Sequence, residues 1–400
     1  MSKSFIKQIC EIENLFLSCF IFLIIAPFPL VIYNFCIPSL PAIKDYLQPT
    51  WGIELIVGSY VLGSGISYLP YGLLSEKISS KKILVLGMLI CLAGTVFCVL
   101  AKSIEVFILG RLLQGFGAAA CYVLFKVIIM KLFHGQNLTA ILSIGSIFLP
   151  ICPWIAQVMG GYVQSLFSWQ TSFLIIIIYI ISVVLITLVI IKDDKSELTN
   201  KKDITDKMFS YCLSLLKEKR FIIFALLPGL HMAGMAIYFS VSPFLFRQKF
   251  TISSKMYGCL YAFIVMASIF GKIFNTFLIR YLPQKKIILN GIIFIIISGV
   301  ILIVSDLYFS SIFLFIIAMM FYALAGELIC TNSMLQALKT VPKNKLATAN
   351  FIQASLFMIT AFLLNNAAIF LKESQIKFSI ALIVLGILGL LLFNSDNTDG

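Results

Sequence analysis

The sequence predicts an all-α membrane protein with twelve transmembrane helices in two six-helix bundles. Hydrophobic residues make up 60% of the 400 residues and charged residues only 12%, which is too much apolar surface for a soluble core of this length. Continuous apolar runs of roughly 20 residues recur along the chain, and this length crosses the hydrocarbon layer of a bilayer as a helix. The runs do not alternate apolar with polar residues as the strands of a membrane barrel do.

Twelve apolar runs are the predicted spans. The first run is too long for the apolar part of a signal peptide, so it is counted as a span. The approximate limits are 15–37, 51–74, 83–101, 105–131, 138–163, 170–191, 221–245, 256–279, 286–304, 308–337, 346–371 and 376–393.

One long polar stretch, 192–220, separates the sixth span from the seventh. It holds eight cations and six acids. We therefore predict an N-terminal six-helix bundle over 1–191, a cytoplasmic linker over 192–220 and a C-terminal six-helix bundle over 221–400.

The net charge of +13 is distributed in a way that predicts topology. In a soluble protein this charge would suggest a nucleic acid or an acidic partner, but here most cations lie in short segments between apolar runs. With the N-terminus inside, twenty of the thirty Lys and Arg lie in inner segments and seven in outer ones. The other three, Arg111, Lys126 and Lys272, lie within spans. The bias predicts two cytoplasmic termini and no nucleic-acid partner.

A short repeat relates the two halves. "KKILVLG" at 81–87 recurs as "KKIILNG" at 285–291, an offset of 204 residues, and each copy opens a span that follows an even-numbered span of its half. Parallel copies of a six-helix unit are one plan of secondary transporters, which bind substrate between the two copies near the middle of the membrane. The repeat favours a transporter.

The fourth span carries two cations on one helix face. At 100° per residue, Arg111, Gly115, Ala118, Tyr122 and Lys126 share a side. A charge in the middle of a membrane costs at least about 2.5–3.5 kcal/mol, so this side is expected to line a wet cavity or to pack against other helices. For Arg111 we favour a role in the cavity. For Lys126 a cavity role and a side chain that reaches back to the membrane surface both remain open.

Glu327 is the one acidic residue well inside a predicted span. A carboxyl group in such surroundings can exchange a proton near neutral pH, which a proton-coupled transporter requires. The alternative is a protonated Glu327 that serves packing alone. We favour the role in proton coupling.

Three other polar residues within spans are candidates for the substrate cavity. They are Asn34 in the first span, Gln114 in the fourth and His231 near the middle of the seventh. A histidine within a helix is more often a packing residue than a proton site. We therefore do not assign proton transfer to His231, but we keep it as a candidate for the cavity.

Five segments resemble motifs of the major facilitator superfamily. "GLLSEKISSKK" resembles its cytoplasmic loop motif between spans two and three, and "RLLQGFGAAA" its fourth-span motif with an intramembrane arginine. "PWIAQVMGG" is similar to the fifth-span antiporter motif. "IPSLPAI" and "YFSVSPFLFRQKF" look most like the Bcr/CflA branch of drug:proton antiporters. These segments are 72–82, 111–120, 153–161, 37–43 and 238–250.

The resemblance implies the major facilitator fold, alternating access and export driven by protons. It assigns Arg111 to proton coupling and places Tyr238 in the substrate cavity. It also assigns residues to gating, either in the loop that closes the inner side or in the fifth span, which seals the cavity. These are Gly72, Glu76, Lys77, Lys81, Pro153, Gly160 and Gly161.

The sequence departs from the family pattern at several positions. Glu76 replaces an Asp of the loop motif, Gln157 replaces the second Pro of the antiporter motif, and Asn34 stands where some members have a carboxylate used for protons and cations. Asn34 cannot ionise. Either Glu327 takes over the role, or the coupling differs, or the substrate is not a cationic drug.

The leading prediction is a monomeric proton antiporter of a bacterial inner membrane that exports small amphipathic molecules. The alternative is a metabolite or siderophore carrier of the same fold, an importer or an exporter, whose substrate is anionic or zwitterionic because Arg111, Lys126 and Lys272 are cations within spans. An enzyme is not expected, since the chain has two His and no nucleophile or phosphate-binding motif. No cofactor and no metal are predicted.

Overall fold

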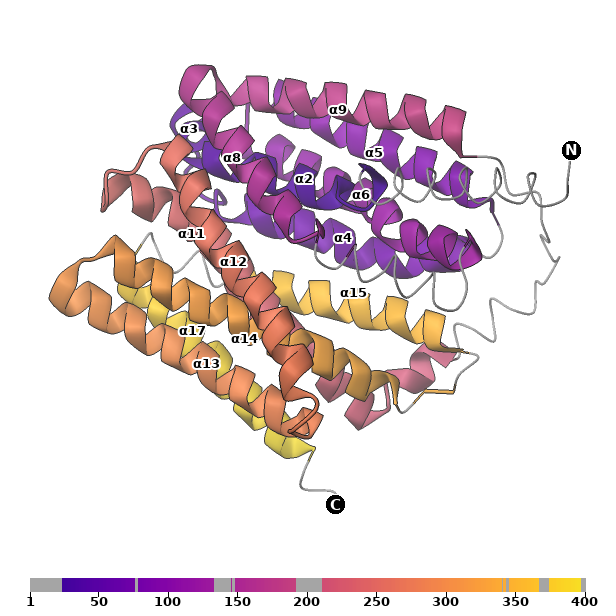
Figure 1. The fold of residues 1–400 in the computed structure, drawn as a ribbon. Helices are drawn as coiled ribbons and strands as arrows, with labels where there is room; N and C mark the ends of the chain where they lie inside the picture. Colours follow the sequence, from indigo (N-terminus) through magenta and orange to yellow (C-terminus); the bar gives the residue numbers. More distant parts are fainter. Residues whose placement is uncertain are drawn as a thin grey trace, which may run out of the picture.

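The computed structural model describes residues 24–75, 78–132, 145, 148–191, 211–339, 341–342, 345–366 and 374–396. Within these ranges every regular element is a helix, and the long helices lie alongside one another (Figure 1). Nine of them are long and apolar enough to cross a membrane.

The helices before the predicted linker pack on one another. Helix α6 contacts α4 and α5, α5 also contacts α9, and α2 contacts α6 and α8. These elements are α2 (Phe28–Phe35), η2 (Ile37–Ser39), α3 (Leu40–Leu47), α4 (Leu55–Leu74), α5 (Ser80–Leu100), α6 (Ile104–Leu132), α8 (Ile151–Leu166) and α9 (Trp169–Ile190).

The helices after the linker form a second group. Helix α14 contacts α11, α12 and α13, while α17 packs on α11 and α13. The elements are α11 (Lys219–Gln248), α12 (Ser254–Leu278), α13 (Gln284–Val304), η3 (Ser305–Phe309), α14 (Ile312–Leu338), α15 (Leu346–Asn365) and α17 (Gln375–Ser395). The predicted boundaries at 191 and 221 stay a prediction, and 192–210 lies outside the described residues.

Prolines divide the first span. Helix α2 begins directly after Pro27 and has Pro29 in its first turn, where a missing N–H costs least. Pro38 and Pro41 open the next two short elements in the same way. The described part of the predicted span 15–37 is therefore a chain of short helices.

Serine caps begin four of the long helices. Each Ser hydroxyl accepts a hydrogen bond from the backbone N–H three residues later, which satisfies one donor that the first turn leaves free. The pairs are Ser79 with Lys82 at 3.4 Å, Ser253 with Met256 at 3.3 Å, Ser311 with Leu314 at 3.5 Å and Ser374 with Lys377 at 3.4 Å.

Two predicted starts are displaced by four residues. Helix α4 begins at Leu55, where the sequence predicts a start at 51. The sequence places the start of the tenth span at 308, whereas α14 begins at Ile312. The apolar residues Leu307, Tyr308 and Phe309 belong to the wide turn η3 and are exposed. Ser310, with a φ of 44°, ends this turn. The sequence prediction included this turn in the span because its residues are as apolar as those of a helix. Large apolar side chains are accepted at a membrane surface outside the helices as well.

Glycines allow α4 and α6 to approach closely. A Cβ on Gly115 would strike the carbonyl oxygen of Tyr60, and one on Gly63 would strike the carbonyl oxygen of Leu112. The two backbones therefore touch where Arg111 leaves α6.

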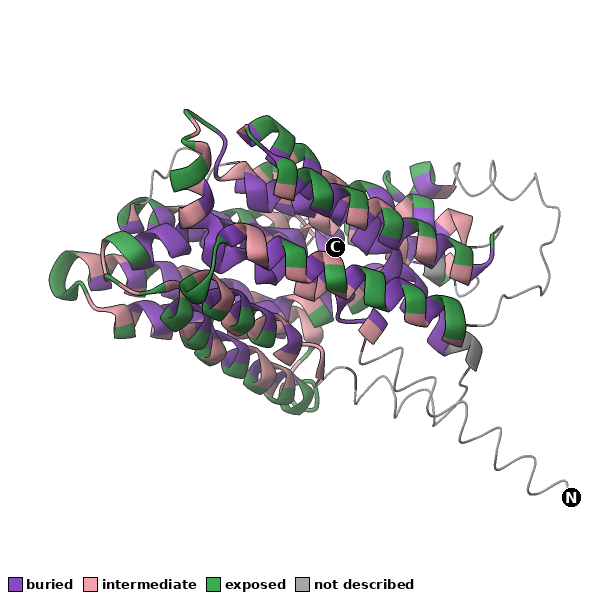
Figure 2. Cartoon of the chain, turned by 90° about the horizontal axis from the view of Figure 1, so that it is seen from above, coloured by how far each residue is buried: buried purple, intermediate pink, exposed green. Residues whose placement is uncertain are grey.

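Exposed apolar residues cover the outward faces of the peripheral helices. In Figure 2 exposed and buried residues alternate along these helices, as expected of helices with one face toward lipid. Ile178, Leu185 and Val189 of α9 are examples, with exposures of 65%, 58% and 84%. Such a surface is stable in a bilayer and not in water.

Two pairs of helices make the most extensive contacts between the two groups. Helices α4 and α15 lie side by side over their length, since Gly58 lies near Asn365, Gly65 against Met358 and Gly72 against Phe351. Helix α12 begins beside α8 and moves away from it (Figure 1). We call the end of the molecule that contains α3 and the start of α12 the α3 end.

Candidate functional site

Arg111 is completely buried among helices before the linker. Its Nη1 donates to the side-chain oxygen of Gln114 at 2.8 Å and to the carbonyl oxygen of Ile32 at 3.4 Å, and its Nε donates to the carbonyl oxygen of Ile56 at 3.4 Å. The guanidinium lies 4.8 Å from the ring centre of Tyr60. Its second terminal nitrogen, Nη2, has no hydrogen-bond partner in the structure. The cation is thus held by dipoles and a ring.

Gln114 is fixed by two neighbouring side chains. Its nitrogen donates to the Thr95 hydroxyl at 2.8 Å, and the Cys98 thiol lies 3.9 Å from its oxygen. Thr95 and Cys98 belong to α5, so the amide of Gln114 connects Arg111 to α5 in addition to α2 and α4. The amide is oriented with its oxygen toward the guanidinium. The structure therefore brings together two of the predicted site residues, Arg111 and Gln114.

Asn34 and Gln157 form a buried pair between α2 and α8. The Gln157 nitrogen donates to the Asn34 oxygen at 2.9 Å, and the Asn34 nitrogen donates to the carbonyl oxygen of Leu30 at 2.8 Å. Asn34 is 2% exposed and Gln157 is fully buried. Two departures from the family motifs, far apart in the sequence, are thus one neutral contact.

The predicted stripe of α6 packs against α4. Tyr122 lies with its ring 5.1 Å from that of Tyr68, and Gly115 meets Tyr60. Lys126 is on α6, but its side chain lies outside the described residues. The sequence left two possibilities for this side of the helix, a wet cavity or packing. In the structure, the part of it around Arg111 is packed against other helices.

Glu327 is half-buried near the middle of α14 and faces α12. Its Cβ and Cγ lie 3.2 Å from the place where Gly271 would carry a Cβ, so the stem of the side chain rests on that glycine. Lys272, the next residue of α12, is a half-buried cation that interacts electrostatically with Glu327. Among acids in the described ranges, Glu327 alone lies away from helix ends.

A polar contact supports the same two helices one turn further on. The Asn332 nitrogen donates to the Asn275 oxygen at 2.7 Å and to the carbonyl oxygen of Leu328 at 2.8 Å. Both asparagines are buried, which fixes the register of α12 against α14 and so the position of Lys272 relative to Glu327.

His231 forms a clamp between α11 and α14. Its ring is stacked on Tyr322 with centres 4.8 Å apart, its Nε2 donates to the carbonyl oxygen of Tyr322 at 3.2 Å, and the Tyr322 hydroxyl donates to the carbonyl oxygen of His231 at 2.8 Å. Gly326 and Gly234 leave room for the two rings. These contacts are those of a packing residue.

Tyr238 lies elsewhere in the second group of helices. It is 1% exposed, and its ring packs 5.3 Å from Phe239 and 6.4 Å from Phe315. The structure does not bring Tyr238 into contact with Arg111 or Glu327.

The residues assigned to gating lie at opposite ends of the molecule. The Lys81 ammonium donates to the carbonyl oxygen of Leu188 at 2.7 Å, at the end away from α3. Gly160 lies against the carbonyl oxygen of Phe35 and Gly161 against that of Ser254. Pro153 is in the first turn of α8 and Gly72 meets α15, whereas Glu76 and Lys77 lie outside the described residues.

Charged contacts join the two groups of helices at the α3 end. Arg247 and Asp45 form an ion pair of 2.6 Å, Lys44 lies 5.0 Å from the ring centre of Phe244, and Lys255 lies 4.4 Å from that of Tyr162. Each contact pairs a residue before the linker with one after it. These pairs could not be predicted from the sequence, because each residue alone resembles an ordinary loop residue.

A ring contact also crosses between the groups and was missed from the sequence. Tyr33 of α2 packs 5.7 Å from Phe239 of α11 and 5.1 Å from Tyr60. Tyr33 is 5% exposed and its hydroxyl has no hydrogen-bond partner in the structure. The sequence pointed to Tyr33 only through its position next to Asn34, a predicted cavity residue.

Several proteins described as transporters or multidrug resistance proteins are similar to most of the chain. An "Uncharacterized transporter" of Rickettsia bellii (strain RML369-C) is 25% identical over 296 residues, 73% of this chain and 71% of the relative. "Multidrug resistance protein MdtL" of Escherichia coli O157:H7 is 23% identical over 299 residues, 74% of this chain and 75% of the relative.

A solved structure has the same fold. It is a bacterial homolog of the human lysosomal transporter Spinster, in an inward-facing and unoccupied conformation, with a TM-score of 0.71, 13% identity, and coverage of 95% of this chain and 96% of that one. At this identity the likeness concerns the fold alone, and it confirms the predicted all-α membrane architecture.

The sequence also matches the family model described as "Major Facilitator Superfamily" over residues 16–365, which is most of the chain. Membership of this family means that the chain is a transporter of small molecules and not an enzyme. The chain is a multi-pass membrane protein that belongs to the major facilitator superfamily.

Proposed function

We propose that this transporter is a proton-coupled exporter of small amphipathic molecules, of the Bcr/CflA type, in a bacterial inner membrane with both termini in the cytoplasm. The observation that carries the proposal is the position of Glu327, half-buried in the middle of α14 beside Lys272. An ionisable pair inside a membrane is costly, and such groups mark proton pathways. The multidrug resistance relatives support the substrate class.

Glu327 and Lys272 supply a charge switch. The ionised carboxylate and the ammonium together are neutral, whereas protonation of Glu327 leaves the Lys272 cation without its counter-charge. Proton uptake therefore changes the net charge between α12 and α14 by one unit. Substrate binding and protonation then favour different states of the transporter, which is what coupling requires.

The α3 end faces the periplasm in this proposal. The contacts of Asp45 with Arg247 and of Tyr162 with Lys255 keep that end closed, and substrate enters from the cytoplasm. The two groups of helices then rock about the interface of α4 with α15. Opening the α3 end breaks these exposed contacts, which are individually weak.

The test is proton-driven transport by purified protein in liposomes, with ethidium as the cationic amphipathic probe and an imposed pH gradient as the driving force. Glu327→Gln is expected to lose at least tenfold in rate, since an amide cannot carry the proton. Glu105→Gln, the same change at an exposed acid in the first turn of α6, is the matched control and keeps the rate. Concentration of ethidium by the Glu327→Gln protein would refute the coupling role.

A second candidate function is a carrier of anionic or zwitterionic metabolites or siderophores. Arg111 favours it, because this buried cation has no acidic partner in the described part of the chain and has one nitrogen without a hydrogen bond. The pair of Asn34 with Gln157 is neutral and so offers no negative charge to a cation.

Two probes of equal shape and opposite charge separate the candidates. Tetraphenylphosphonium is a cation and tetraphenylborate an anion, and binding of each to the detergent-purified protein is measured by calorimetry. Tighter binding of the cation supports the exporter of cationic amphipathic molecules. Tighter binding of the anion, lost in Arg111→Gln, supports the second candidate.

A further inference from the structure

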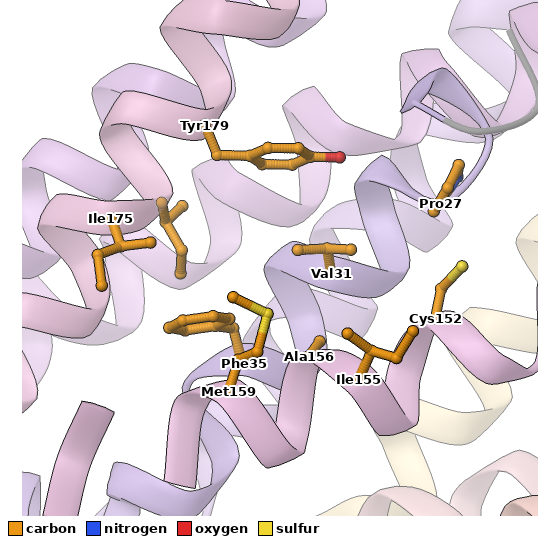
Figure 3. Close-up of a pocket in the computed structure, with 10 residues that line it drawn as sticks. Pro27, Val31, Phe35, Cys152, Ile155, Ala156, Met159, Ile175 and Tyr179 are labelled. Carbon is orange, nitrogen blue, oxygen red and sulfur yellow. The ribbon is translucent and has the colours of Figure 1, made fainter. Parts of the chain in front are cut away.

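An apolar pocket of about 260 Å³ lies between α2, α8 and α9 (Figure 3). Val31 and Phe35 form its α2 side, Ile155, Ala156 and Met159 its α8 side, and Tyr179 projects across it from α9. This pocket is separate from Arg111, Glu327 and their partners.

Prolines account for the pocket. Pro27 lies just before α2 and Pro29 in its first turn, and Pro150 and Pro153 have the corresponding places at the start of α8. Because α2 and α8 begin at these prolines and are shorter than α9, we infer that space is left where the three helices meet.

The pocket opens toward the bilayer. Ile155 is 44% exposed and Met159 is 51% exposed, and both belong to α8, which lies in the predicted fifth span. By contrast, Phe35 on the inner side is 3% exposed and Ala156 is also 3% exposed. If α8 spans the membrane as predicted, the opening faces lipid hydrocarbon, while Phe35 and Ala156 form the buried side of the pocket.

Water has no place in this pocket. The polar groups that line it already have partners, because the Tyr179 hydroxyl donates to the carbonyl oxygen of Ile24 at 3.3 Å and the Cys152 thiol lies 3.6 Å from that of Phe148. A stable water needs two or more free polar partners, and an empty apolar space forfeits van der Waals contacts.

We propose that this pocket binds one acyl chain of a bilayer phospholipid, with the headgroup outside. The volume suits part of a single chain and is far too small for a whole lipid. The chain fills the gap on the lipid side of α2 and α8, while the hydrogen bond of Asn34 with Gln157 joins the same two helices on their inner side. The spacing of α2, α8 and α9 then depends on a bound lipid.

The test uses protein in liposomes that contain a phospholipid with a photoreactive diazirine in its acyl chain, followed by mass spectrometry of the labelled residues. If lipid contact followed exposure alone, Leu185 of α9, which is 58% exposed, would be labelled far more than Phe35. A bound chain reverses this order, and we expect several-fold more label at Val31 and Phe35 than at Leu185. Label ordered by exposure would overturn the proposal.

Pocket-filling variants supply the control. Ala156→Phe places a ring in the space and is expected to abolish label at Phe35, whereas Leu185→Phe, on the outer face of α9, leaves it unchanged. Val31→Phe serves the same purpose should Ala156→Phe not fold. Label at Phe35 that survives both fillings, or that added tetraphenylphosphonium removes, would assign the signal to another route or to substrate and refute a resident lipid.

Discussion

Arg111 and Glu327 are both charged residues within the membrane, yet their surroundings differ. Arg111 is fully buried and held by carbonyl oxygens, Gln114 and a tyrosine ring. Glu327 is half-buried, rests on a glycine and lies beside Lys272. The guanidinium is held in place by neighbouring dipoles, whereas in the proposed mechanism the carboxyl group gains and loses a proton beside a cation. One charge suits a fixed field and the other a switch.

The largest effect is expected from Arg111→Leu. The change removes the strong donor to the oxygen of Gln114 and the guanidinium's bonds to two carbonyl oxygens, of which that of Ile56 still accepts from the Ser59 hydroxyl. A buried polar group left without a partner costs about 1–3 kcal/mol. We expect a loss of thermal stability large enough to reduce folded protein, measured by unfolding of detergent-purified protein. Glu327→Gln is expected to change stability by less than about 1 kcal/mol. Equal losses for the two variants would remove the distinction between fixed and switching charge.

Gln157→Ala tests the neutral pair that accompanies Arg111 in the first group of helices. It leaves the Asn34 oxygen buried without its donor, so we expect a loss of about 1–3 kcal/mol in the same unfolding measurement. Asn34→Ala together with Gln157→Ala is expected to cost less than the sum of the two single changes, because both remove the same hydrogen bond. Additive losses would mean that the pair does not couple α2 to α8.

Lys272→Met sharpens the account of Glu327. If the two side chains form one switch, the double variant with Glu327→Gln transports no worse than Glu327→Gln alone, and the coupling between them is about 0.5–3 kcal/mol. The measurement is the initial rate of proton-driven transport for the four proteins of the cycle. Independent effects of the two changes would show that Lys272 is not the partner of Glu327.

The smallest effect on stability is expected from Asp45→Asn at the α3 end. Asp45 and Arg247 are 59% and 55% exposed, and an exposed ion pair contributes about 0.2–1 kcal/mol. Its effect is expected instead on conformation, with more of the protein open at the α3 end. Distances between spin labels on α3 and α11 measure this. An unchanged distance distribution would show that the ion pair does not hold that end closed.

The long spans were predictable because a single property, continuous hydrophobicity over the width of a bilayer, specifies them. Helices α5, α9 and α13 begin and end within a few residues of the predicted limits. The start of α14 was wrong by four residues, since the turn before it is as apolar as a span. The breaks in the first span follow from its prolines, but the position of each short helix does not.

The candidate site was predictable as a list of residues and not as a set of contacts. Arg111 and Glu327 were selected because charge is rare in apolar runs. That Asn34 bonds to Gln157, more than a hundred positions away, and that Tyr33 meets Phe239 depend on how helices pack. His231, placed among cavity candidates, is bonded to Tyr322 in a clamp that the sequence did not reveal.

By itself the sequence determined that this protein spans a membrane and has a few charged residues within its apolar segments, because hydrophobicity and motif order are properties of short segments. Only the tertiary structure decided which of these charges is enclosed by dipoles from other helices and which lies beside a residue of opposite charge. The reason is physical: the environment of a buried charge is made by side chains and carbonyl groups from other helices, and their position is set by packing between segments remote in the chain.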